Sequence, residues 1–218
     1  MTFSIIARDP ASAAFGVAVS TAVPCVGAIV PWAQSGVGAI ATQSYSNIEL
    51  GRDGLKLVEL GLSPKAALES LLAEDPGAAL RQVAGIDARG RTFAFTGGEC
   101  VEWCGSREGD GYSVQGNMLV GQETIDAMAE AFESNAGRSL HQRLMLALEA
   151  GQAAGGDKRG RVSAALLVTP ADATTGPPAV QFDPRRYEMN IRVDEHADPV
   201  AELRRIFEAI RQLGREQK

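Results

Sequence analysis

The sequence becomes strand-like at its second residue, where the run Thr2-Phe3-Ser4-Ile5-Ile6-Ala7 is rich in apolar and β-branched side chains. Most chains begin with several poorly ordered residues, so a strand this early places the first residues within a sheet. The segment 9–12 has the composition of a turn, and a second strand is expected over 15–20. The pattern predicts a hairpin over residues 2–20.

Further strand and helix signals follow along the chain. The segments 26–31 and 37–44 are apolar along their whole length, which indicates strands covered on both faces. A second hairpin is expected from strands 81–87 and 91–96, a Gly-rich loop over 97–117, and a strand-like stretch over 118–120. Later strands are expected over 162–169 and 187–193, with a loop at 170–178 between them.

Helices are predicted at 54–60, 64–73 after the Ser63 cap, 123–133, 139–152 and from Pro199 onward. Strands therefore cluster at the two ends of the chain, and the helices fall between and after them. This order predicts an α+β fold in which two sheets pack face to face between outer helix layers. The length of 218 residues suits a single domain over 1–218.

Composition limits the classes of partner. The net charge of −6 offers no basic surplus for phosphates, so nucleic acid is not expected as a partner. The longest apolar stretch, 23–30, is too short to span a membrane. No basic segment followed by an apolar run opens the chain, so we expect no signal peptide and a cytoplasmic protein. The apolar segment 23–32 is predicted to form an interface of a homodimer or higher homo-oligomer.

Thr2 combines a hydroxyl with a backbone nitrogen that becomes a free α-amine if Met1 is removed. Such an amine has a pKa near ~7.7–8.0, so it can accept the hydroxyl proton and activate the oxygen as a nucleophile. The alternative is that Thr2 is simply the first residue of a strand.

The most polar segment is the loop Gly155-Gly156-Asp157-Lys158-Arg159-Gly160-Arg161, between a helix and an apolar strand. Asp157, Arg159 and Arg161 could bind a substrate carboxylate or hold a nucleophile in place. The alternative is a structural ion-pair loop. Three glycines in seven residues indicate close backbone approach, and Glu149 precedes the loop by about one to two helical turns, so it could face the same space.

Four amide side chains are further candidates. Gln115 and Asn117 end the Gly-rich loop and could donate hydrogen bonds to a developing oxyanion. Gln43 ends an apolar strand and Asn47 lies in the loop after it. Buried amides need hydrogen-bond partners, which a ligand can supply.

Histidine and metal chemistry have little support in the sequence. The chain has two histidines, His141 and His196, and no G-x-S-x-G motif, so a histidine-based triad is not expected. The three cysteines lack zinc-site spacing, and we expect reduced thiols and neither a metal nor a cofactor. A metal site in the segment 194–198 is a weaker alternative to a solvated helix cap.

These motifs resemble one bacterial family along nearly the whole chain. The segments TFSIIARDP, GVAVS, GVGAIATQ, RQVAGID, AFTG, VQGNMLVG, EAGQAAGGDKRGR and RVDEHADPVAELRRI are similar to the family called domain of unknown function 1028. That family is placed among the N-terminal-nucleophile hydrolases. The resemblance implies a four-layer αββα sandwich with two antiparallel sheets between helix layers, and amide hydrolysis by an N-terminal nucleophile.

Carried onto this sequence, the resemblance makes Thr2 the nucleophile, with Ser4 on the same side of the strand. We therefore expect an amidohydrolase acting on a small-molecule amide or carboxylate substrate. Thr2, Ser4, Asn117 and Asp157 would be its catalytic residues. The expected substrate-binding residues are Gln43, Asn47, Gln115, Glu149, Arg159 and Arg161. The alternative is a catalytically silent binding or scaffold protein on the same fold.

Overall fold

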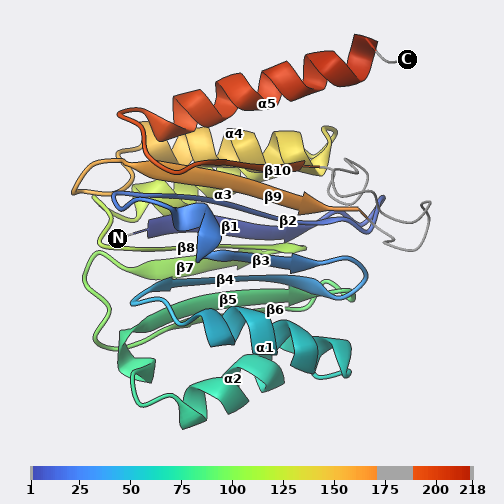
Figure 1. The fold of residues 1–218 in the computed structure, drawn as a ribbon. Helices are drawn as coiled ribbons and strands as arrows, with labels where there is room; N and C mark the ends of the chain where they lie inside the picture. The colour runs from blue at the N-terminus through green and yellow to red at the C-terminus, as the bar shows by residue number, and fades with distance from the viewer. Residues whose placement is uncertain (1, 171–188, 217–218) are drawn as a thin grey trace.

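Two antiparallel sheets form the centre of the computed structural model, which describes residues 2–170 and 189–216 (Figure 1). The larger sheet has the strand order β10-β9-β2-β1-β8-β7 and the smaller sheet has the order β3-β4-β5-β6. The strands of the larger sheet are β1 (Thr2–Arg8), β2 (Phe15–Thr21), β7 (Gly105–Gly109), β8 (Tyr112–Asn117), β9 (Ser163–Thr169) and β10 (Met189–Val193). Those of the smaller sheet are β3 (Pro31–Gln34), β4 (Gly38–Ser44), β5 (Arg81–Asp87) and β6 (Thr92–Thr96).

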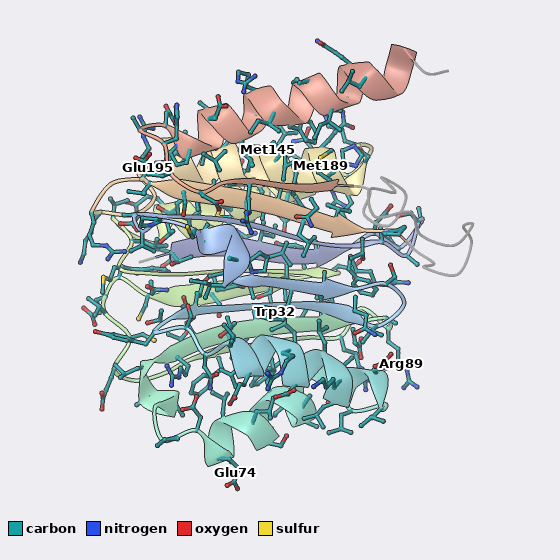
Figure 2. The ribbon with its side chains drawn as sticks, in the orientation of Figure 1. Trp32, Glu74, Arg89, Met145, Met189 and Glu195 are labelled. Carbon is teal, nitrogen blue, oxygen red and sulfur yellow. The ribbon has the colours of Figure 1, made fainter. Side chains whose placement is uncertain are left out.

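Helices cover the outer face of each sheet. The helices α1 (Ile48–Glu59) and α2 (Pro64–Glu74) pack on the smaller sheet. The helices α3 (Glu123–Glu133), α4 (Leu140–Ala153) and α5 (Pro199–Glu216) pack on the larger one. Figure 2 shows Met145 and Met189 on this side of the molecule, where both belong to the apolar layer between helices and sheet. Trp32 lies beside α1 on the other side, where its ring fills the space left by Gly51.

Three apolar layers hold the stack together: one between α3–α5 and the larger sheet, one between the two sheets, and one between the smaller sheet and α1–α2. The predicted α+β class and the four-layer αββα sandwich are therefore confirmed. None of the helices in the described ranges is long and apolar enough to cross a lipid bilayer.

The central strand β1 divides its side chains between two of these layers. Phe3, Ile5 and Ala7 pack toward the helices, whereas Ile6 packs between the sheets. Because side chains alternate along a strand, Thr2 and Ser4 share the inner face with Ile6. The space between the sheets is therefore apolar along most of β1 and polar where β1 begins.

The apolar segment 26–31 does not form the strand that its composition suggested. Residues Val26–Ala28 form a short 3-10 helix, and the strand β3 begins only at Pro31. A short apolar run does not distinguish a strand from a helical turn. Here Val30 donates its N–H to the carbonyl of Val26, which turns both valines into the layer between the sheets.

The expected loop at 97–117 contains two strands, β7 and β8, and β8 pairs directly with β1. The strand β8 was missed because its inward side chains are the polar Ser113, Gln115 and Asn117, and these are fully or almost fully buried. Buried polar side chains are tolerated where they find hydrogen-bond partners. The strand-like stretch 118–120 is irregular instead, with Met118 at a φ of 52°.

Both predicted hairpins and all the predicted helices are present, with small differences at their ends. The first helix starts earlier than expected, because Asn47 caps it by accepting a hydrogen bond from the N–H of Glu49. The expected loop at 170–178 and the first two residues of the expected strand 187–193 lie outside the described residues, apart from Pro170.

Candidate functional site

A pocket of about 290 Å³ opens at the polar end of the space between the sheets, where β1 begins. Ligand pockets typically measure about 300–1,000 Å³, so this one suits a small molecule. One wall is apolar and comes from the segment between β2 and β3, and the rest is mostly polar. The lining residues are Thr2, Val23, Val26, Ile29, Val30, Ser44, Tyr45, Ser46, Asn117, Met118 and Arg159.

Thr2 places a hydroxyl in this pocket. It lies on the central strand β1, opposite Thr21 of β2 on one side and Asn117 of β8 on the other. The Thr2 Oγ1 atom lies 3.1 Å from the Thr21 Oγ1 atom, and the Thr2 side chain is nearly buried. The two neighbouring strands therefore fix the backbone of Thr2, and Thr21 contacts its hydroxyl.

A network of buried amides lies next to Thr2 and has one consistent orientation. The Nε2 atom of Gln82 donates to the backbone carbonyl oxygens of Gly116 at 2.8 Å and Gly105 at 3.3 Å. Carbonyl oxygens only accept hydrogen bonds, so Oε1 of Gln82 must be the acceptor on the other side. It receives hydrogen bonds from Gln43 Nε2 at 2.8 Å and from Asn117 Nδ2 at 3.0 Å.

The hydrogen-bond chain continues from Gln43 through Ser4 to Gln115. Gln43 Oε1 accepts from Ser4 Oγ at 2.7 Å, and Ser4 Oγ accepts from Gln115 Nε2 at 2.6 Å. Gln115 Oε1 in turn accepts from Ser113 Oγ at 3.1 Å. Ser4, Gln43 and Gln115 do come together near Thr2, but they form a buried support and are not among the residues that line the pocket.

Asn117 is the member of this network that reaches the pocket. Its Nδ2 atom donates one of its two hydrogens to Gln82 Oε1, and its Oδ1 atom is buried and has no hydrogen-bond partner. An unpaired buried acceptor costs about 1–3 kcal/mol. Asn117, which lines the pocket, therefore carries an unpaired acceptor in addition to its amide donor.

The glycine-rich loop brings Asp157 and Arg159 to the same end of the sandwich. Gly155, Gly156 and Gly160 all have positive φ angles, of 113°, 60° and 114°, which glycine adopts without steric cost. The buried Asp157 carboxylate accepts hydrogen bonds from the N–H of Ala22 at 3.0 Å and the N–H of Arg159 at 2.9 Å.

Asp157 therefore ties its own loop to the residue that follows β2, close to Thr21. Arg159 lines the pocket, and its Nη2 atom lies 3.4 Å from the Asp157 carboxylate. Arg159 is the one charged residue among the pocket-lining residues in the described chain. A negatively charged group of a small ligand would therefore meet a cation in this pocket.

Several residues at the pocket have unfavourable backbone conformations. Four non-glycine residues of the described chain have positive φ angles, and two of them, Ser44 at 68° and Met118 at 52°, line the pocket. A third, Cys25 at 64°, precedes the pocket residue Val26. Such conformations cost about 1–3 kcal/mol each and are found most often at functional sites.

Three predicted site residues lie elsewhere. Asn47 caps α1 and donates to the Asp75 carboxylate at 2.9 Å. Glu149 accepts two hydrogen bonds from the Arg204 guanidinium, at 2.6 and 2.5 Å, which joins α4 to α5. Arg161 forms an ion pair with Asp198 at 3.3 Å. None of the three is among the residues that line the pocket.

The two histidines and the acidic segment 194–198 have local roles. Burial lowers the pKa of His141, whose ring contacts Phe207. His196 Nδ1 accepts a hydrogen bond from the N–H of Asp198, just before α5 begins. Within residues 2–170 and 189–216, no group of three His, Cys, Asp or Glu side chains is placed to hold a metal ion.

Sequence analysis missed Thr21, Gln82 and the apolar wall over 23–30. Gln82 carried a signal, because it is the polar residue of the otherwise apolar strand segment 82–86. A buried amide in such a strand requires partners. Thr21 carried no signal beyond its place at the end of β2.

The two sheets lie between outer helix layers, and Thr2 stands at the start of the central strand β1. The chain belongs to the DUF1028 family: the model of this family of unknown function matches residues 2–203. The family resemblance of the sequence is thereby confirmed.

Two solved structures are similar to this chain. A Silicibacter pomeroyi protein, described by the same family model, is 32% identical, with a TM-score of 0.82 over 95% of this chain and 88% of that chain. Anbu, described as an ancestral beta-subunit, from Yersinia bercovieri is 11% identical, with a TM-score of 0.42 over 97% of this chain and 96% of that chain. A comparison with curated proteins finds no match.

Proposed function

We propose that the protein is an N-terminal-nucleophile amidohydrolase that uses Thr2, after removal of Met1, to cleave a small amide bearing a carboxylate. The observation that carries the proposal is the place of Thr2: it pairs with β2 and β8, its hydroxyl lies 3.1 Å from that of Thr21, and it lines a pocket that Arg159 also lines. Sites of this kind need a fixed nucleophile beside a substrate-binding group.

In the proposed reaction, Thr2 Oγ attacks the amide carbonyl carbon while the α-amine of Thr2 takes the hydroxyl proton. The C–N bond then breaks, the amine leaves with that proton, and the acyl group remains as an ester on Thr2. Water hydrolyses the ester, releases the carboxylic acid and restores the hydroxyl. An unperturbed α-amine has a pKa near ~7.7–8.0, so such a group is an effective base at neutral and mildly alkaline pH.

The neighbouring residues have supporting roles. Arg159 binds the substrate carboxylate. Asp157 is a positioning residue, because its carboxylate holds the backbone of the segment after Thr21. Asn117 Nδ2 donates one of its two N–H groups to Gln82 Oε1, and we assign stabilisation of the oxyanion to a backbone N–H at the rim of the pocket.

The experiment is an assay of the full chain with Met1 removal verified by intact mass. A panel of N-acyl amino acids is tested with wild type, Thr2→Ser and Thr2→Ala. We expect measurable hydrolysis by wild type, reduced hydrolysis by Thr2→Ser, and none above background by Thr2→Ala. Equal turnover by wild type and Thr2→Ala would refute the nucleophile. Binding of the panel without turnover by any form would support the silent binding protein instead.

A further inference from the structure

The buried Oδ1 atom of Asn117 is the feature of the pocket that the proposed reaction leaves unused. It lacks a hydrogen-bond partner, although Asn117 is completely buried and lines the pocket. A carbonyl oxygen in this position requires a donor, and leaving it unpaired is costly. A ligand that supplies an N–H or O–H group at this point would complete the site.

The orientation of this amide cannot be reversed without breaking the network next to it. Turning the Asn117 amide by 180° about the Cβ–Cγ bond would place Oδ1 against Gln82 Oε1, so that two acceptors would face each other. Turning Gln82 as well would place its Oε1 against the carbonyl oxygens of Gly116 and Gly105. The backbone of β8 and β7 therefore fixes Asn117 as an acceptor.

Asn117 and Thr2 are direct neighbours across the β1–β8 pair, with both side chains on the inner face of the sheet. Side chains paired in this way have Cβ atoms about 4.5–5.5 Å apart. In an amide, the N–H is attached to the carbonyl carbon that a nucleophile attacks. A hydroxyl and an acceptor on adjacent strands therefore match the two ends of one amide group.

We infer that Asn117 Oδ1 accepts a hydrogen bond from the scissile N–H, so that the pocket selects secondary amides over esters and N-alkylated amides. This inference rests on the proposed function. Val23, Val26 and Ile29 form the apolar wall of the same pocket, and Arg159 supplies the cation. The substrate class is thus an N-acyl amino acid with a short apolar acyl group and a hydrogen on its amide nitrogen.

The size of the expected preference follows from the unpaired acceptor. Sites that hydrogen-bond a substrate N–H or O–H reject analogues that lack it, because a buried polar group is then left unpaired. One such group corresponds to roughly a tenfold to hundredfold difference in binding. An ester oxygen in place of the N–H turns the contact into one between two acceptors, so the higher value applies.

The test uses the full-length Thr2→Ala protein, which binds ligands without consuming them, and isothermal titration calorimetry. Three matched probes share one acyl group and one carboxylate: N-isobutyrylglycine, its N-methyl analogue N-isobutyrylsarcosine, and the ester O-isobutyrylglycolate. We expect N-isobutyrylglycine to bind about a hundredfold more tightly than O-isobutyrylglycolate. The ester is the decisive comparison, because the sarcosine methyl also adds bulk.

Two further variants, each in the Thr2→Ala background, distinguish the contribution of Asn117 to the amide preference from that of Arg159. Asn117→Ala is expected to bring the ratio of the two dissociation constants close to one. Arg159→Ala is expected to weaken both probes while keeping the ratio. Circular dichroism checks that each variant is folded.

Equal binding of amide and ester by Thr2→Ala would overturn the inference, and so would a ratio unaffected by Asn117→Ala. Suppose instead that Asn117→Ala, with Thr2 intact, lowers hydrolysis of all probes equally and shifts the pH profile. Then Oδ1 serves the α-amine of Thr2, and the inference also fails. The proposed function fails separately, if Thr2→Ala hydrolyses the amide as fast as wild type or if no form of the protein hydrolyses it.

Discussion

Replacing Gln82 with leucine would test whether the buried amide network is as fully connected as the structure indicates. The change removes the acceptor of Asn117 Nδ2 and the closest acceptor of Gln43 Nε2, in a region that is completely buried. Each buried donor left unpaired costs about 1–3 kcal/mol. Gln43 Nε2 keeps two longer contacts of 3.4 Å with backbone carbonyls, so we expect a loss of about 3 kcal/mol in the free energy of unfolding.

Urea unfolding followed by circular dichroism gives this free energy by linear extrapolation. The matched control is Gln34→Leu, on the edge strand β3, where the glutamine makes one hydrogen bond to Glu59 at the surface. It should change stability by less than about 0.5 kcal/mol. A loss below about 1 kcal/mol for Gln82→Leu, with an unchanged m-value, would refute the reasoning.

Two other predictions concern ion pairs away from the pocket. Hydrogen bonding to Arg81 holds the pKa of Asp75 at about 2, below its ordinary value of 3.8. The ionised Asp75 therefore stabilises the folded protein fully above about pH 4, and this contribution is lost as the pH falls through 2. In urea unfolding, the free energy of unfolding of wild type should be about 2 kcal/mol higher than that of Asp75→Asn at pH 6, and almost the same at pH 2. A difference that does not change with pH would contradict this. Glu149→Gln should lower the free energy of unfolding by about 1 kcal/mol and leave kcat/KM for the amide unchanged. A raised KM would instead indicate that Glu149 contributes to substrate binding.

Much of the fold was predictable because apolar periodicity and turn residues agreed. The helices after Ser63 and Ser139 and the hairpin around the turn before Gly90 were found from local signals alone. The strand β8 was not, because Ser113 and Gln115 look like surface residues until their partners on other strands are known. Polar burial depends on contacts distant in sequence, which a local pattern does not contain.

The candidate site was predictable to a similar degree. Thr2, Asn117, Asp157 and Arg159 do meet at one end of the sandwich. The role of Asn117 as an acceptor could not be derived from the sequence, because it depends on Gln82, which is 35 residues away along the chain. Glu149 was placed near the loop by helical spacing, but its partner comes from α5, which spacing alone does not reveal.

The positive-φ residues at the pocket have a consequence for inactivation by heat. Ser44, Met118 and Cys25 are kept in their unfavourable conformations by the strands and the 3-10 helix next to them. Their local preference is to relax, so the shape of the pocket depends on the rigidity of the whole sandwich. On warming, the rim should lose its geometry before the sheets melt, and activity should then disappear at a lower temperature than secondary structure.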